Sequence, residues 1–142
     1  AQSDIVSLHV PYFPGKNDKM ANAEFFSKMK DGSIFLNTAR GELQDNEAIL
    51  AALKSGKLDG YGTDVFANET AFFFKKLGSA AEISDPTVRE LVQMYPKVLV
   101  TPHIGSNTDE ALANMIEYSM DNFNEILTTG TTKNLVALPE AK

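Results

Sequence analysis

The chain has 142 residues, of which 43% are hydrophobic and none is cysteine, and its formal net charge is −6 at pH 7. These values suit one globular domain, exclude disulfides and thiolate chemistry, and are compatible with a cytoplasmic protein. Because the sequence has neither an apolar run of about 20 residues nor a basic patch, we expect it to bind neither a membrane nor nucleic acid.

Short runs rich in β-branched and aromatic residues alternate along the chain with segments of helical periodicity. The predicted elements, in chain order, are a strand at 4–10, a helix at 22–29, a strand at 33–39, a helix at 46–54, a strand at 60–66, a helix at 86–95, a strand at 97–101, a helix at 108–127 and an extended tail from 131. This alternation predicts an α/β fold in which a parallel sheet carries helices on its faces, joined by right-handed crossovers.

The connection between the third strand and the third helix is not an ordinary polar loop. It contains three consecutive aromatic residues, Phe72, Phe73 and Phe74. Clustered aromatic side chains are typical of contacts between domains and subunits. We therefore expect these rings either to wall off a substrate cleft or to be buried against another domain or subunit.

Four chemically informative side chains follow the predicted strands. Arg40 comes after the second strand, Asp64 and Glu69 come at or after the end of the third, and His103 comes after the fourth. Ligands of an open parallel sheet bind beyond the carboxyl ends of its strands, so these side chains should collect at one edge. Each of them taken alone is more often a surface or salt-bridge residue than a functional one.

Together these residue types suit the reduction of a 2-keto acid. The planar guanidinium of Arg40 can bind the carboxylate and the neighbouring carbonyl. Histidine titrates nearest neutral pH, which makes His103 the natural proton donor to the alkoxide that reduction leaves. A carboxylate beside the imidazole favours its protonated form, and we assign this role to Glu69 because Asp64 lies within or at the end of its strand. The same residue types also suit hydrolysis or aldol chemistry, so they do not fix the reaction alone.

Five short motifs occur in one order along the chain. They are LHVP at 8–11, LNTARG at 36–41, Asp45 with Ala48, TDVF at 63–66 and VTPHIG at 100–105. Together they resemble the nucleotide-binding domain of the D-isomer-specific 2-hydroxyacid dehydrogenases, and the resemblance covers nearly the whole chain. It implies that NAD is the cofactor, that the substrate is a small 2-keto or 2-hydroxy acid, and that the protein is a cytoplasmic homodimer.

The resemblance also implies a role for each candidate site residue. Arg40 matches the arginine that holds the substrate, His103 the acid/base, and Glu69 the carboxylate partner of that histidine. Asp64 matches the aspartate that positions the nicotinamide carboxamide. No metal site is expected. The contacts with the dinucleotide are expected from Val10, Pro11, Asn17, Thr38 and Ala39.

The sequence contains no G-x-G-x-x-G motif, the phosphate-binding loop of the first half of a dinucleotide-binding fold. The resemblance therefore implies that residues 1–142 are the C-terminal part of the NAD-binding domain, the second half of a Rossmann-like doubly wound parallel sheet. A missing N-terminal half would carry this loop, and the long last helix and the tail would return to the substrate domain. We expect the first strand to leave an exposed sheet edge, so that the chain alone self-associates, pairs with that half or is marginally stable, and has no turnover.

Within the family, the segment after Glu69 and residues 128–142 are most similar to bacterial D-lactate and D-2-hydroxyisocaproate dehydrogenases. A glutamate rather than a glutamine beside the histidine disfavours the formate dehydrogenase branch. Two alternatives remain open. One is a phosphoglycerate- or glyoxylate-type dehydrogenase of the same family, and the other is a non-enzymatic NAD-sensing module of the corepressor kind.

Overall fold

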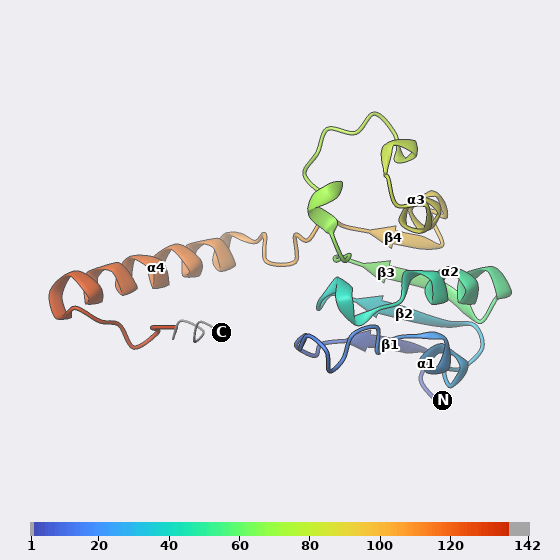
Figure 1. The fold of residues 1–142 in the computed structure, drawn as a ribbon, viewed down its shortest axis with the longest axis horizontal. Coiled ribbons are helices and arrows are strands. Elements are labelled where there is room, and N and C mark those ends of the chain that lie inside the picture. The colour runs from blue at the N-terminus through green and yellow to red at the C-terminus, as the bar shows by residue number, and fades with distance from the viewer. Residues whose placement is uncertain (1, 137–142) are drawn as a thin grey trace. The chain divides into compact units, whose positions relative to one another are not determined.

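Four parallel strands, neighbours in the order β1-β2-β3-β4, form the sheet of the computed structural model (Figure 1). The structure describes residues 2–136 and divides into two compact units, one that ends at Ile104 and one that begins at Gly105. The strands are Ile5–Leu8 (β1), Ser33–Asn37 (β2), Leu58–Thr63 (β3) and Val98–Val100 (β4). The helices of the first unit are Ala23–Ser27 (α1), Asn46–Ser55 (α2) and Pro86–Gln93 (α3), and short 3-10 turns span Gly41–Leu43, Glu69–Ala71 and Ala80–Glu82. The predicted α/β fold with a parallel sheet is confirmed.

The boundaries of β3 differ most from the prediction. The strand begins at Leu58, which pairs with Ser33 of β2, and it ends at Thr63 rather than at residue 66. Gly60 and Gly62 weaken the side-chain pattern from which a strand is predicted, because glycine has no side chain to show on either face. As a result, Asp64 lies just beyond the strand and not within it.

Side-chain caps explain where the three helices begin. The side chain of Asn22 accepts a hydrogen bond from the N–H of Phe25 at 3.1 Å, and this cap starts α1. Asp45 caps α2 and Asp85 caps α3 in the same manner. Ser, Thr, Asp and Asn at this position typically stabilise a helix by about 1 kcal/mol relative to alanine. The caps therefore fix the loops that enter each helix, two of which border the candidate site.

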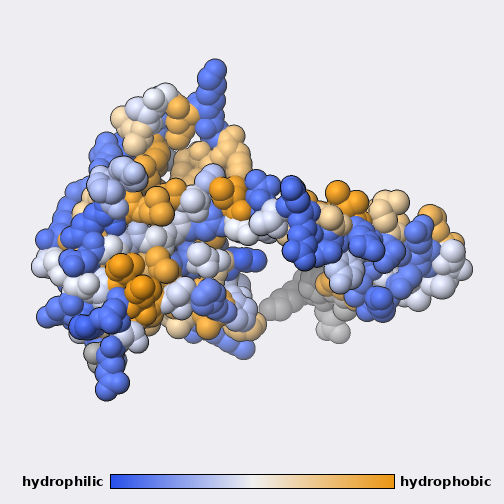
Figure 2. All heavy atoms as spheres, turned by 180° about the vertical axis from the view of Figure 1, so that it is seen from behind, coloured by the Kyte–Doolittle hydropathy of each residue, from blue (hydrophilic) through white to orange (hydrophobic). Residues whose placement is uncertain are grey.

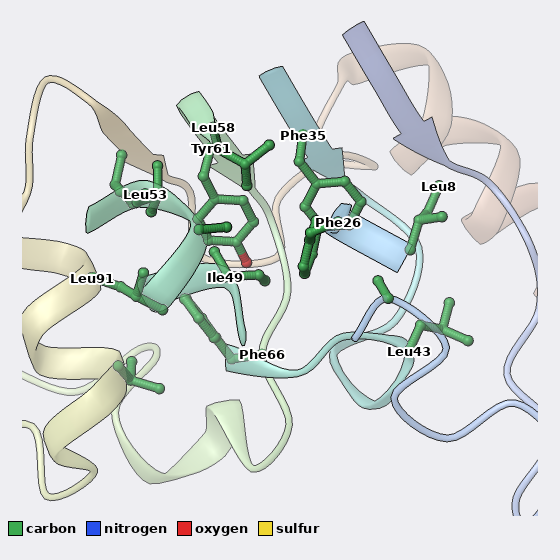
Figure 3. Close-up of a cluster of buried hydrophobic side chains, with 14 of the residues drawn as sticks. Leu8, Phe26, Phe35, Leu43, Ile49, Leu53, Leu58, Tyr61, Phe66 and Leu91 are labelled. Carbon is green, nitrogen blue, oxygen red and sulfur yellow. The ribbon is translucent and has the colours of Figure 1, made fainter. Parts of the chain in front are cut away.

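The core lies between the sheet and helices α1–α3 (Figure 3). Phe35 of β2 is fully buried, and its ring meets Phe26 of α1 edge to face with centroids 5.1 Å apart. Phe35 also stacks on Tyr61 of β3 at 5.9 Å. Ile49 and Leu53 of α2 are buried in the same cluster. Because each large apolar side chain buried here contributes about 1.5–3 kcal/mol, this layer stabilises the packing of the helices on the sheet.

Among the described residues of the first unit, the core residues and helices α1–α3 lie on one face of the sheet only. α2 contacts both α1 and α3, and all three contribute to the same core cluster. The other face presents Ile5, Ile34 and Leu99, whose exposed fractions are 56%, 37% and 58%. The sequence predicted helices on the faces of the sheet, and the described helices of the first unit cover one face. The other face is apolar and exposed, and β1 is an edge strand of the sheet, as the sequence predicted.

The three consecutive phenylalanines differ in burial. Phe73 is buried and contacts the rings of Phe66 and Phe72, with centroids 6.1 and 4.8 Å away. Phe74 adopts a left-handed backbone conformation and is 78% exposed. The expectation that these rings wall off a cleft or pack on another domain is wrong for Phe73, which packs inside its own unit.

The described part of the second unit is one long helix with a short segment on either side. Helix α4 spans Asp109–Thr129, begins at the capping side chain of Thr108 and ends at Gly130. Its apolar residues are exposed and show as orange patches in Figure 2. The segment after it was predicted to be extended, but the N–H of Leu135 bonds the carbonyl of Thr132 and closes a turn. Residues 137–142 of the predicted tail lie outside the described residues. No helix in the described part of the chain is long and apolar enough to cross a membrane.

Candidate active site

A buried asparagine shapes the turn that carries Arg40. Asn37 is the last residue of β2, and its side chain accepts a hydrogen bond from the N–H of Ala39 at 3.0 Å. The same side chain donates to the carbonyl of Arg40 at 3.0 Å. These two bonds fix the backbone immediately after the strand. The guanidinium of Arg40 remains exposed and donates to the carbonyl of Ala39 at 2.6 Å.

Gly41 lets this turn approach the loop after β3. A Cβ atom on Gly41 would lie 2.0 Å from the carbonyl carbon of Phe66 and 2.1 Å from the nitrogen of Ala67. Both of these atoms belong to the backbone and cannot move aside as a side chain can. Only glycine fits there, and its absence of a side chain brings Arg40 close to the loop that carries Glu69.

Glu69 and His103 are in direct contact. Glu69 follows Asn68, which has a positive φ of 57°, and it starts a 3-10 turn. One carboxylate oxygen accepts a hydrogen bond from the N–H of Phe66 at 3.0 Å, and the other meets Nδ1 of His103. The side chains of His103 and Glu69 are 39% and 22% exposed, so the pair is accessible but partly shielded. A carboxylate in this position holds the orientation of the imidazole ring.

Asp64 anchors the turn on which His103 sits. His103 has a positive φ of 52°, and its N–H donates to the carbonyl of Asp64 at 2.8 Å. The buried carboxylate of Asp64 accepts from the hydroxyl of Thr101 at 2.6 Å and from the N–H of Ile104 at 3.0 Å. From the sequence, Asp64 differs from Glu69 by its place within or at the end of the predicted strand. The structure separates them by contact, because the carboxylate that touches the imidazole is that of Glu69.

The three predicted catalytic residues line one pocket of about 350 Å³. Arg40 reaches it from the loop after β2, Glu69 from the loop after β3, and His103 from the turn after β4. The remaining lining includes Asn68 and Thr70. Because the carboxyl ends of parallel strands share one edge, the sequence could predict this convergence.

A second pocket of about 540 Å³ adjoins the first through Arg40, which lines both. Four of the predicted cofactor residues line it, together with two residues that the sequence argument missed. The four are Val10, Pro11, Thr38 and Ala39, and the two are His9 and Tyr12. His9 directly follows β1, so the rule that singled out Arg40 could have found it too.

The other two predicted cofactor residues lie elsewhere. Asp64 is 6% exposed and is not among the residues that line either pocket. Asn17 stabilises the loop that contributes Pro11 and Tyr12 to the second pocket. Its side-chain amide donates to the carbonyl of Pro11 at 2.8 Å and accepts from the N–H of Phe13 at 2.7 Å. In the same loop, the hydroxyl of Tyr12 bonds the carboxylate of Asp18, which raises the pKa of the tyrosine and lowers that of the aspartate.

Comparisons with known proteins identify relatives of this chain. Residues 1–105 match the family model described as D-isomer specific 2-hydroxyacid dehydrogenase, NAD binding domain. The chain is 42% identical over 130 residues to a D-lactate dehydrogenase of Lactiplantibacillus plantarum, a match that covers 92% of this chain and 38% of the relative. It is 39% identical over 133 residues to an aromatic 2-oxoacid reductase of Clostridium sporogenes, covering 94% of this chain and 39% of the relative.

A solved structure shows the same fold. The crystal structure of D-lactate dehydrogenase with NAD+ from Lactobacillus jensenii superposes with a TM-score of 0.83 at 34% identity, covering 97% of this chain and 40% of that one. The chain thus spans about two fifths of the length of the curated relatives that it matches. On the match of residues 1–105 and the shared fold, the chain belongs to the D-isomer specific 2-hydroxyacid dehydrogenase family and contains NAD-binding domain sequence of that family.

Proposed function

We propose that this chain works within a longer protein that uses NADH to reduce a small 2-oxo acid to the D-2-hydroxy acid. The single observation that carries the proposal is the pocket that Arg40 lines together with the Glu69–His103 pair. A permanent cation and an acid/base pair within one pocket match the two needs of this substrate, a carboxylate to be held and a carbonyl oxygen to be protonated.

The residues of the second pocket fit a dinucleotide. Its lining consists of two strand-end segments, Val10–Pro11 and Thr38–Ala39, at the edge of the sheet where such cofactors bind. The shared residue Arg40 places this space directly beside the acid/base pair. NADH bound there would supply a hydride to the carbonyl carbon of the substrate.

This chain's own residues supply the remaining chemistry. The guanidinium of Arg40 donates parallel hydrogen bonds to the carboxylate and the carbonyl oxygen of the substrate, which fixes its orientation. As the carbonyl carbon gains the hydride, the electron pair of the C=O π bond moves to oxygen, and the imidazolium of His103 gives that oxygen its proton. Glu69 holds the ring through Nδ1 and offsets its positive charge until the proton leaves. The assignment of Asp64 to the nicotinamide carboxamide remains a prediction.

The substrate we propose first is pyruvate or a close analogue, because the relatives include D-lactate dehydrogenases. An aromatic 2-oxo acid is the second candidate, favoured by the 39% identity to the Clostridium sporogenes reductase. We also propose a cytoplasmic homodimer in which an N-terminal part of the protein pairs with β1 and a substrate domain receives α4 and the tail. The exposed edge strand and the exposed apolar sheet face support this arrangement.

The test uses the longer protein that contains this sequence. NADH oxidation is followed by absorbance with pyruvate, 2-oxoisocaproate, phenylpyruvate, glyoxylate and phosphohydroxypyruvate, and the configuration of the product is determined. We expect turnover with the first three and a D product. His103→Gln should lower kcat by about 10²–10⁴-fold and leave the Kd for NADH within about threefold. NADH binding without turnover of any oxo acid would instead support a binding module.

A further inference from the structure

A pair of buried amide side chains bonds the backbone of the segments that carry Arg40 and Glu69. Asn37 is fully buried and Gln44 is 3% exposed. The Nδ2 of Asn37 donates to Oε1 of Gln44 at 2.8 Å. A buried amide that lost its partners would cost about 1–3 kcal/mol, so each of these groups is held in place by the other.

The amide group of Gln44 continues toward the loop that carries Glu69. Its Nε2 donates to the carbonyl of Val65 at 3.4 Å and to Oδ1 of Asn46 at 3.1 Å. The peptide unit that begins with this carbonyl ends in the N–H of Phe66, which donates to Oε2 of Glu69 at 3.0 Å. The other oxygen of Glu69 meets His103. An unbroken series of contacts therefore joins Gln44 to the imidazole.

The planar peptide unit between Val65 and Phe66 links the orientation of its carbonyl to that of its N–H. A peptide bond is planar, so fixing the direction of the Val65 carbonyl also fixes the direction of the Phe66 N–H. The hydroxyl of Thr63 donates to the same carbonyl at 2.7 Å. Gln44 and Thr63 thus both donate to the Val65 carbonyl, and the Phe66 N–H at the other end of the peptide donates to the Glu69 carboxylate. Hydrogen bonds in such a chain also polarise one another in a low-dielectric interior.

The same amide pair reaches the substrate-anchoring side of the pocket. Asn37 also donates to the carbonyl of Arg40, and Gly41 packs on the peptide between Phe66 and Ala67. We infer that Gln44 is a positioning residue: it acts on His103 through the Val65–Phe66 peptide and Glu69, and it sets the acid/base pair relative to Arg40. This inference rests on the proposed function.

The first test is Gln44→Met in the longer protein, a change that keeps the length and volume of the side chain but removes its donors and acceptor. We expect kcat for oxo-acid reduction to fall by about three- to tenfold, the factor that corresponds to one net hydrogen bond. The KM for NADH should stay within about twofold, because Gln44 lines neither pocket. Ile49→Val is the matched control: it removes a buried methylene from α2 and should lower the Tm without lowering kcat.

The second test asks whether Gln44 acts through Glu69. Gln44→Met is combined with Glu69→Ala in a double-mutant cycle. We expect no further loss of kcat from Gln44→Met once Glu69 is alanine, since the contact that it supports no longer exists. Equal losses of kcat from Gln44→Met in both backgrounds would overturn the inference about Gln44 but not the proposed function. Normal turnover of the Glu69→Ala variant would overturn the proposed acid/base pair itself.

Thr63→Val provides a second route if Gln44→Met does not fold. It removes the other donor to the Val65 carbonyl while keeping the shape of the side chain. We expect the same selective loss of kcat and the same absence of effect in the Glu69→Ala background. A fall of the Tm with unchanged kcat would show that the peptide does not need this support and would overturn the inference.

Discussion

Nδ1 of His103 lies against Oε1 of Glu69, although the two residues are 34 positions apart in the sequence. Glu69 starts a turn after β3, and His103 follows β4. β3 and β4 are parallel neighbours, so their carboxyl ends bring both loops to one place. The contact occupies Nδ1 and leaves Nε2 as the ring nitrogen that can meet a substrate oxygen.

Arg40→Lys tests the need for a planar fork in the first pocket. Lysine keeps the charge but cannot form two parallel hydrogen bonds to a carboxylate and a carbonyl. We expect kcat/KM for the oxo acid to fall by about 10- to 100-fold, the equivalent of losing one charge-assisted hydrogen bond. Steady-state kinetics with varied oxo acid and saturating NADH measure this change.

Arg89→Lys is the matched control for that substitution. Arg89 lies on α3 and donates to the carbonyl of Ile83, away from both pockets. Its replacement should leave KM for the oxo acid unchanged. A similar loss in both variants would mean that the effect of Arg40→Lys does not come from its place in the pocket.

The order of the elements and the convergence of Arg40, Glu69 and His103 were predictable from the sequence. Arg40 and His103 each follow a run of strand-forming residues, and the edge rule for parallel sheets does not require exact boundaries. The rule even survives the error in β3, whose glycines hide its pattern. The same rule would have identified His9, which directly follows β1 and lines the second pocket.

The buried residues that hold the site loops in place were not predictable in this way. Gln44 stands between Leu43 and Asp45 near the start of a helix, and nothing in local periodicity distinguishes a buried glutamine there from an exposed one. Its burial depends on contact with Asn37 and Val65, which only the folded chain brings together. The same holds for Phe73 and Phe74: they are adjacent in sequence, but only the first points into the core.

Asn17→Ala tests whether Asn17 acts on the cofactor indirectly. Loss of its bonds to Pro11 and Phe13 should loosen the loop that borders the second pocket, and the Kd for NADH should rise by about three- to tenfold. kcat at saturating NADH should not change. Fluorescence titration with NADH provides the measurement.

Asn17→Asp separates this brace from a direct contact. The aspartate keeps the oxygen that accepts from Phe13 but loses the donor to Pro11, so its Kd should lie between those of the wild type and Asn17→Ala. If Asn17 touched the anionic cofactor itself, the added negative charge should make Asn17→Asp the weaker binder of the two variants.

The turn after α4 should open in acid. The hydroxyl of Thr132 and the N–H of Lys133 donate to the Glu125 carboxylate, and they lower its pKa from the ordinary value of 4.5. A carboxyl group whose pKa is lowered by folding contributes stability above its unfolded pKa, and that contribution is lost as the pH falls through the lower folded value. The Lys133 amide shift in NMR should therefore show a transition below pH 4.5. Glu125→Gln should abolish the transition, and a midpoint above that value would contradict the assignment.

Gly41→Ala tests how closely the Arg40 turn must approach the loop after β3. The new Cβ would lie 2.0 Å from the carbonyl carbon of Phe66, so one of the two loops has to move. Overpacking of this kind typically costs about 1–3 kcal/mol, and we expect a lower Tm together with a lower kcat/KM. Gly60→Ala is the control, because its Cβ would meet nothing closer than Ile34 Cγ1 at 3.5 Å. Kinetics and thermal unfolding of both variants decide the point: an unchanged kcat/KM in Gly41→Ala would show that the separation of Arg40 from Glu69 does not limit the reaction.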